Sequence, residues 1–197
     1  MADDARGGGL PLPAPVLTTD RLLLRPFTPD DLDDVRAMRS HEAVARHLPG
    51  PVPTEEEVRS ALARKVGRRG IERDGDSLSL AVVPRGGRTV VGDVTLTWIS
   101  TMHRQAEIGG TFHPDHQRQG LATAAGTALL SLAFDRLGAE RVVGRCSADN
   151  RASAALCERL GMRREGHFRH ALWLTGDWVD VYVYAVLSGE WAARPGS

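Results

Sequence analysis

The chain has 197 residues, of which 42% are hydrophobic, and its 25 basic and 25 acidic side chains give a formal net charge of zero. This length and apolar content predict one folded domain and exclude a wholly disordered chain. A zero net charge argues against a protein that coats nucleic acid with a broad basic surface. Two cysteines, Cys146 and Cys157, are too few for a disulfide-stapled secreted scaffold.

The ends of the chain differ in composition from its body. Residues 1–15 contain three consecutive glycines and three prolines, which predicts a flexible leader. We expect a single domain over 16–191 and a short tail over 192–197. No apolar run approaches the roughly 20 residues that span a bilayer, and no signal-peptide pattern is present. A soluble, cytoplasmic protein without a membrane partner is therefore predicted.

The first half of the chain alternates strand and helix signals. A strand is predicted over 17–25, and Pro29 with the following aspartates is typical of a helix start. Thr54 and Glu57 have the spacing of a capping box, which predicts a second helix beginning there. Residues 78–83 and 89–99 then predict two strands joined by a hairpin turn.

The second half continues the mixture and holds one long helix, predicted over 120–137 and closed by Gly138. The other expected elements are strands over 106–112 and 141–146, a short helix over 153–160, and a final antiparallel pair over 163–173 and 178–187. Strands and helices mixed in this way predict one α/β or α+β domain.

The most informative segment is 112–123, where a strand runs through a turn into the long helix. The first N–H groups of a helix lack partners and lie at the positive end of its dipole, so this turn can bind a pyrophosphate. Gly120 lets the backbone approach a ligand and Arg118 adds charge. Neither a Walker loop nor a dinucleotide fingerprint is present. The plainer alternative is an ordinary helix start.

Two motifs in this order resemble the GNAT superfamily of acyl-CoA N-acyltransferases. Residues 117–122, Gln-Arg-Gln-Gly-Leu-Ala, resemble its Gln/Arg-x-x-Gly-x-Gly/Ala signature. Residues 150–162 resemble its Asn-x-x-Ser/Ala element, which ends near Leu-Gly. Segments 19–25, 107–109 and 178–191 are similar to the RimJ/RimL-like branch. The resemblance extends over about 17–191.

The resemblance implies a mixed, mostly antiparallel, curved sheet flanked by helices, with two splayed central strands between which coenzyme A enters. Acetyl-CoA is then the co-substrate. Backbone groups of Thr111 and Phe112 are expected to meet the pantetheine arm, and Asn150 and Ser153 its thioester end. Backbone N–H groups for the pyrophosphate are expected from Arg118, Gln119, Gly120, Leu121, Ala122 and Thr123.

The catalytic groups are less well defined by the sequence. Glu107, beside the splayed pair, is the candidate base for the acceptor amine; the alternative is a solvated carboxylate or an ion pair with Arg104. Cys157 stands where many family members carry the tyrosine that protonates the leaving thiolate. It is either that acid or a packing cysteine, and Ser153 is the other candidate. Arg145 stands where some members have a glutamate base.

The predicted function is an N-acetyltransferase that moves an acetyl group from acetyl-CoA to a primary amine by direct attack. The acceptor is a protein N-terminus of the ribosomal-protein type or a small amine. The alternative is a non-catalytic acyl-CoA sensor on the same fold. No metal site is expected, because His113, His116 and the cysteines fit no zinc spacing. No nucleic-acid partner is expected, because the net charge is zero. The oligomeric state stays open, with a homodimer among the possibilities.

Overall fold

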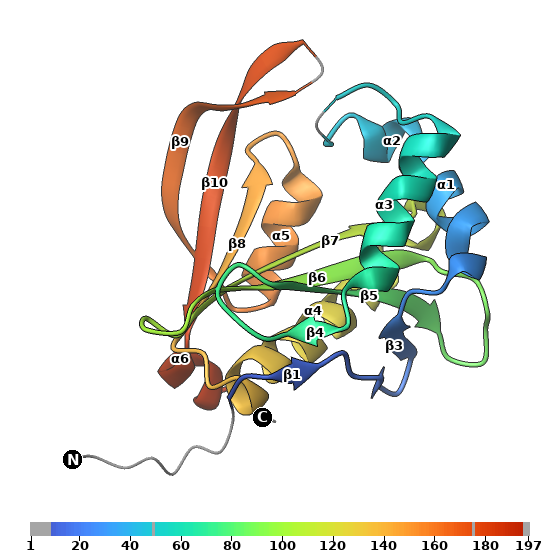
Figure 1. The fold of residues 1–197 in the computed structure, drawn as a ribbon. Helices are drawn as coiled ribbons and strands as arrows, with labels where there is room; N and C mark the ends of the chain where they lie inside the picture. The colour runs from blue at the N-terminus through green and yellow to red at the C-terminus, as the bar shows by residue number, and fades with distance from the viewer. Residues whose placement is uncertain (1–8, 49, 175, 195–197) are drawn as a thin grey trace.

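An eight-stranded sheet forms the centre of the protein in the computed structural model, which describes residues 9–48, 50–174 and 176–194 (Figure 1). The strands lie in the order β2-β3-β5-β6-β7-β8-β10-β9. Every neighbouring pair is antiparallel except β7 and β8, so the mostly antiparallel sheet expected from the sequence is confirmed. Their bounds are β2 Leu17–Thr18, β3 Leu22–Pro26, β5 Ser77–Pro84, β6 Gly92–Ser100, β7 Gln105–Phe112, β8 Arg141–Ser147, β9 Arg163–Leu174 and β10 Asp177–Leu187.

Helices cover both faces of the sheet (Figure 1). Strand β5 illustrates the arrangement: Leu78 and Leu80 belong to the core beneath α4, while Ala81 and Val83 belong to a second core with α1 and α3. Alternate residues of a strand point to opposite faces, so a strand buried on both sides reads as a continuous apolar run. The helices are α1 Leu32–Ser40, α2 Glu42–Ala45, α3 Glu55–Gly67, α4 Leu121–Ser131, α5 Arg151–Arg159 and α6 Ser188–Ala192.

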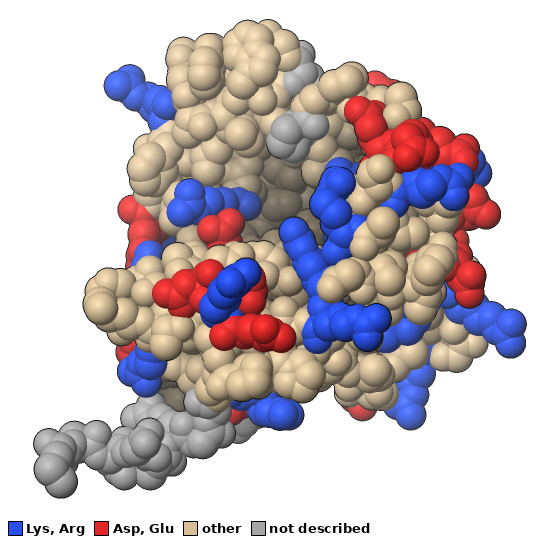
Figure 2. Space-filling model, in the orientation of Figure 1, with Lys and Arg blue, Asp and Glu red and all other residues tan. Residues whose placement is uncertain are grey.

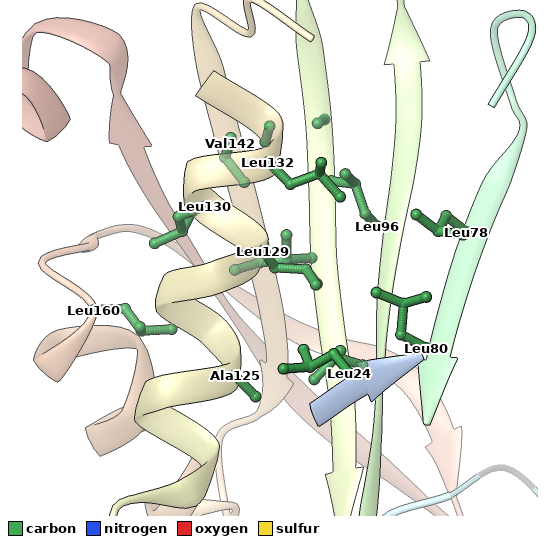
Figure 3. Packing of buried hydrophobic residues seen from close by; sticks show 14 of the residues in the cluster. Leu24, Leu78, Leu80, Leu96, Ala125, Leu129, Leu130, Leu132, Val142 and Leu160 are labelled. Atoms are coloured by element: carbon green, nitrogen blue, oxygen red, sulfur yellow. The ribbon is translucent and has the colours of Figure 1, made fainter. Parts of the chain in front are cut away.

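Helix α4 supplies most of the helical contacts to the larger core (Figure 3). Leu129 and Leu130 are almost completely buried there, and the absence of a side chain at Gly126 lets Leu160 pack closely against the helix. The last turn, Leu132–Arg136, is a π-helix, and the segment ends at Gly138, whose φ is +67°. The predicted helix over 120–137 therefore exists, with a wider final turn that periodicity did not indicate.

The capping box predicted for α3 is present. The Thr54 hydroxyl accepts a hydrogen bond from the Glu57 N–H, and the Glu57 carboxylate accepts one from the Thr54 N–H at 2.7 Å. These hydrogen bonds lower the pKa of Glu57. The helix begins with three glutamates and carries Arg64 and Lys65 in its last turn, as its dipole favours.

The N-terminal region differs from its prediction in two ways. The single strand expected over 17–25 is a hairpin of β2 and β3. The leader expected over 1–15 also contributes to the fold, because Leu12–Pro13 (β1) pairs with Gly70–Ile71 (β4) and Leu12 is 5% exposed. Residues 1–8 of that leader and 195–197 of the tail lie outside the described residues. Long-range pairing of a two-residue strand leaves no local pattern that a sequence reading can detect.

The hairpin of β9 and β10 projects from the edge of the sheet (Figure 1). Trp173 and Trp178 face each other across it with ring centroids 5.3 Å apart and pack as a cross-strand pair. Both rings are about half exposed, so they are not core residues, whereas Tyr184 is buried. No helix in the described part of the chain is long and apolar enough to cross a membrane.

Candidate active site

The sheet opens between its two parallel strands. The pairing of β7 with β8 ends at Ile108 and Gly144. Beyond that point β7 continues to Phe112 with β6 as its partner, and β8 continues to Ser147 with β10 as its partner. The two strands therefore diverge, and the gap expected from the family resemblance lies between residues 109–112 and 145–147.

The backbone groups that line the β7 side of this gap follow from strand alternation. The Thr111 N–H donates to the Asp93 carboxylate on β6 at 3.1 Å, and the His113 N–H donates to the Val91 carbonyl on the same side. Backbone groups of successive strand residues point in opposite directions, so those of Gly110 and Phe112 face the gap. The Thr111 N–H is therefore already bonded, and the Phe112 carbonyl accepts from the Gln117 side chain at 3.1 Å. The predicted backbone contacts of Thr111 and Phe112 with the pantetheine stay a prediction, and strand alternation adds Gly110 as a candidate.

The turn before α4 presents a run of unpaired backbone donors. Within the described residues, none of the six N–H groups of 118–123 has a hydrogen-bond acceptor, and the first helical bond runs from Ala124 N–H to the Gly120 carbonyl at 3.0 Å. Arg118 and Gly120 have φ of +59° and +78°. Left-handed residues in such a turn gather N–H groups around one concave spot, which is an anion site. The six residues expected at the pyrophosphate lie in this turn and in the first turn of α4, and their contact with it stays a prediction.

Two arginines brace this turn, and sequence analysis assigned neither a role. The Arg21 guanidinium donates to the Gln119 carbonyl at 2.6 Å, and Arg159 Nε donates to the Thr123 hydroxyl at 3.3 Å. The partners are 98 and 36 residues apart in the chain. Both bring positive charge to the start of α4, where a phosphate group would be stabilised.

A buried ion pair fixes the end of β7, which lines one side of the gap. Lys65, the single lysine of the chain, pairs with Asp93, which is 6% exposed. Lys65 also lies over the Phe27 ring, 5.1 Å from its centroid. Because Asp93 holds the Thr111 N–H as well, the pair ties α3 to the end of β7. No local sequence pattern predicted this ion pair, because its partners are 28 residues apart.

Helix α5 places the predicted thiol-side residues on one face of the sheet. The Asn150 side chain caps the helix by accepting from the Ser153 N–H at 3.0 Å. Cys157 packs against Gly144, where the gap begins: its sulfur is 3.4 Å from the position that a Cβ would occupy there. Burial, with a smaller effect of Cys146, raises the pKa of the Cys157 thiol to about 12. A thiol this weak is a poor proton donor to a thiolate of ordinary pKa near 8.5, so the structure favours the packing interpretation.

The different surroundings of Ser153 and Cys157 predict that removing each side chain will affect turnover to a different extent. Ser153→Ala should lower kcat more than Cys157→Ala, because the serine hydroxyl can donate to the leaving thiolate whereas the buried cysteine cannot lose its proton readily. The measurement is steady-state thiol release by both variants over a range of pH.

A loss confined to Cys157→Ala, with the basic limb of its pH profile displaced, would contradict that order. Near-normal rates in both variants would remove both residues from the leaving-group step. Circular dichroism and thermal melting of each variant provide the control for misfolding.

Glu107 lies on the opposite face from Cys157. It pairs with Val143, one residue before the gap opens, and its carboxylate oxygen is 3.2 Å from Arg145 Nε. The ion pair expected as its alternative role does not involve Arg104, which pairs with Glu140 at 2.8 Å. Glu107 remains about one-third exposed, so its carboxylate is open to an incoming amine.

Residues 41–47, which include α2, span this open face. The first histidine of this segment, His41, contacts His113 at the exit of β7, with ring centroids 5.5 Å apart. Near its other end, burial and Arg46 lower the pKa of His47, while Asp149 at the exit of β8 raises it. The segment therefore reaches from one splayed strand to the other. Figure 2 shows a hollow between the β9–β10 hairpin and α3, with Lys and Arg side chains gathered on the α3 side.

Comparisons with known proteins agree with this geometry. Residues 21–163 match the model of the acetyltransferase (GNAT) domain. The chain belongs to the GNAT acetyltransferase family. A Bacillus subtilis relative named an uncharacterized N-acetyltransferase, YnaD, is 30% identical over 175 residues, which is 89% of this chain and 98% of that protein. A GNAT acetyltransferase structure from Bacillus anthracis has a TM-score of 0.78 at 28% identity and covers 89% of this chain and 99% of its own.

A further relative, from Vibrio cholerae, is named a spermidine N(1)-acetyltransferase and is 26% identical over 113 residues, 57% of this chain and 65% of that protein. The family membership makes this chain an acyl-CoA-dependent acetyltransferase with acetyl-CoA as its co-substrate. The residues fit that co-substrate, because a gap lined by backbone groups leads to a turn with six free donors. Among the described residues, no group of three or more His, Cys, Asp and Glu side chains could hold a metal ion.

Proposed function

We propose that this GNAT acetyltransferase binds acetyl-CoA along the gap between β7 and β8 and transfers the acetyl group directly to a primary amine that enters from the face of Glu107. The proposal is supported by two kinds of group that lie at one opening, backbone donors for a phosphate and a carboxylate for an amine. Unpaired N–H donors of 118–123 lie at one end for the pyrophosphate. The Glu107 carboxylate lies on the open face at the other end.

In the proposed reaction the acceptor nitrogen attacks the thioester carbonyl carbon, so that an N–C bond forms and the C–S bond breaks. The ammonium proton passes to Glu107, directly or through water, before or during attack. The gap-facing N–H groups of Gly110 and Phe112 are suited to stabilise the developing oxyanion. Coenzyme A leaves as a thiolate, to which the Ser153 hydroxyl can donate a hydrogen bond. Asn150, at the start of α5, is proposed to contact the pantetheine.

The acceptor is proposed to be the α-amine of a protein or of a small molecule. An α-amino group has a pKa near 7.7–8.0, against about 10.4 for a lysine side chain, so a larger share of it is neutral at pH 7 and one modest base suffices. The resemblance to the RimJ/RimL-like branch supports a protein N-terminus. The spermidine acetyltransferase relative makes a polyamine the competing acceptor.

Binding of the co-substrate is tested first. Acetyl-CoA at about 100 times its Kd should stabilise the fold by about 2.7 kcal/mol, because it binds the native state only. Thermal melting with and without acetyl-CoA measures this gain, and coenzyme A without the acetyl group is the matched control. A melting temperature that does not move at millimolar acetyl-CoA would contradict the proposed site.

A further inference from the structure

The ion pair between Arg145 and Glu107, at the opening of the gap, bears on which acceptor amines can bind. Arg145 is the first residue of β8 beyond the last pair with β7, and its side chain is 59% exposed on the face of Glu107. A guanidinium has five N–H donors. Within the described residues, the contact recorded for Arg145 is the one from Nε to Glu107, so its terminal nitrogens are available to a ligand.

The spacing of this pair matches one kind of amine. In an α-amino carbonyl compound the nitrogen and the carbonyl oxygen are about 3 Å apart, as the bond lengths of the peptide unit require. Arg145 Nε and the Glu107 carboxylate are separated by 3.2 Å. A substrate ammonium can therefore pair with Glu107 while its neighbouring oxygen accepts from Arg145, so that one ion pair of the free protein is replaced by two contacts to the substrate.

The surrounding charges do not suit a polyamine. Residues 41–47 over the gap contribute one cation, Arg46, and one carboxylate, Glu42. Two carboxylates on this face are already paired, Glu107 with Arg145 and Asp93 with Lys65, and Asp149 lies near His47. Figure 2 shows further basic side chains along the α3 side of the hollow. A ligand with several ammonium groups would meet cations on this rim, which costs affinity.

We propose that Arg145 recognises the carbonyl or carboxylate oxygen next to the acceptor amine, and so restricts the enzyme to α-amino carbonyl acceptors. This inference rests on the proposed function, because it requires the amine to approach Glu107. It gives a role to the arginine that stands where some relatives have a glutamate base. Free amino acids and peptide N-termini share the recognised chemistry and are separated by the test.

The experiment compares kcat/KM for alaninamide, alanine, an alanyl peptide, propylamine and spermidine. Wild-type protein should prefer the α-amino carbonyl compounds. Arg145→Gln should lower kcat/KM for them about 10- to 100-fold, the effect of losing one charge-assisted hydrogen bond. It should leave propylamine unchanged or improved, because Glu107 is released. Arg145→Lys should restore part of the loss. A larger loss of kcat/KM for alanine than for the alanyl peptide would indicate that Arg145 binds the carboxylate of a free amino acid. An equal loss would indicate that it binds the carbonyl oxygen of a peptide N-terminus.

Arg163→Gln is the matched control, because Arg163, on β9 of the same sheet, forms an ion pair at 2.8 Å with Glu190 of α6. It should change none of the five rates. An equal loss for all acceptors in Arg145→Gln, or a wild-type preference for spermidine, would overturn the inference. Failure of the proposed function has a different signature: acetyl-CoA would not raise the melting temperature of any variant, and no amine would release thiol.

Discussion

Glu107→Gln is expected to lower kcat by 10²–10⁴-fold at neutral pH, the usual loss when a general base is removed. The amide has nearly the same shape as the carboxylate but cannot take the ammonium proton. The loss should shrink as pH rises, because a growing share of the acceptor arrives already neutral. The affinity for coenzyme A should barely change, since the turn over 118–123 is untouched. Steady-state kinetics across pH, with binding measured by calorimetry, check each part.

Glu140→Gln is the matched control, because Glu140 also forms an exposed ion pair, with Arg104, and lies outside the gap. It should keep the wild-type rate. If Glu107 only forms an ion pair with Arg145 and does not act as the base, Glu107→Gln should give a modest loss of kcat that high pH does not rescue. The side chains of Glu107 and Arg145 are both substantially exposed, and exposed ion pairs contribute at most about 1 kcal/mol to the stability of the fold. A Glu107→Gln variant that keeps more than about a third of wild-type kcat would contradict the base assignment, since a lost base costs far more.

Gly120→Val should abolish most of the stabilisation by acetyl-CoA. Gly120 has φ of +78°, which a β-branched residue adopts only with strain of about 1–3 kcal/mol, so the variant should both melt lower and reshape the turn. A 100-fold weaker affinity would reduce the expected gain from about 2.7 to about 0.4 kcal/mol at the same ligand concentration. Thermal melting with and without acetyl-CoA measures the two effects separately.

Gly86→Val separates strain from ligand binding. Gly86 has φ of +80°, lies in the turn between β5 and β6, and has open space around it, so the same strain arises away from the gap. This variant should melt lower than wild type and yet show the full shift with acetyl-CoA. If Gly120→Val also kept the full shift, the turn over 118–123 would not be the pyrophosphate site.

The sequence predicted the elements whose signals are local. The capping box of Thr54 and Glu57 lies within four residues, and the turn that we propose for the pyrophosphate is encoded by a strand, a glycine and a helix start in one short stretch. The gap between β7 and β8 followed from family resemblance and not from periodicity, because no local pattern tells which strands are parallel.

The parts that could not be predicted depend on distant partners. Arg21 reaches the Gln119 carbonyl across 98 residues, and Lys65 reaches Asp93 across 28. An ion pair with Arg104, which is close in sequence, was one alternative to the base role of Glu107, but its carboxylate pairs with Arg145 on the neighbouring strand. The leader was judged flexible from its glycines and prolines, and the pairing of Leu12 with Ile71 overrides that composition. In each case tertiary contact decides between options that local chemistry leaves equal.

The central claim is that the opening between β7 and β8 delivers an acetyl group to an α-amine on the Glu107 face. The most direct measurement incubates the protein with acetyl-CoA and an alanyl peptide, and follows thiol release and the mass of the peptide together. We predict one acetylated α-amine for each thiol released, with both rates falling in Glu107→Gln. Thiol release without acetylated peptide, or equal rates in Glu107→Gln and wild type, would contradict the account.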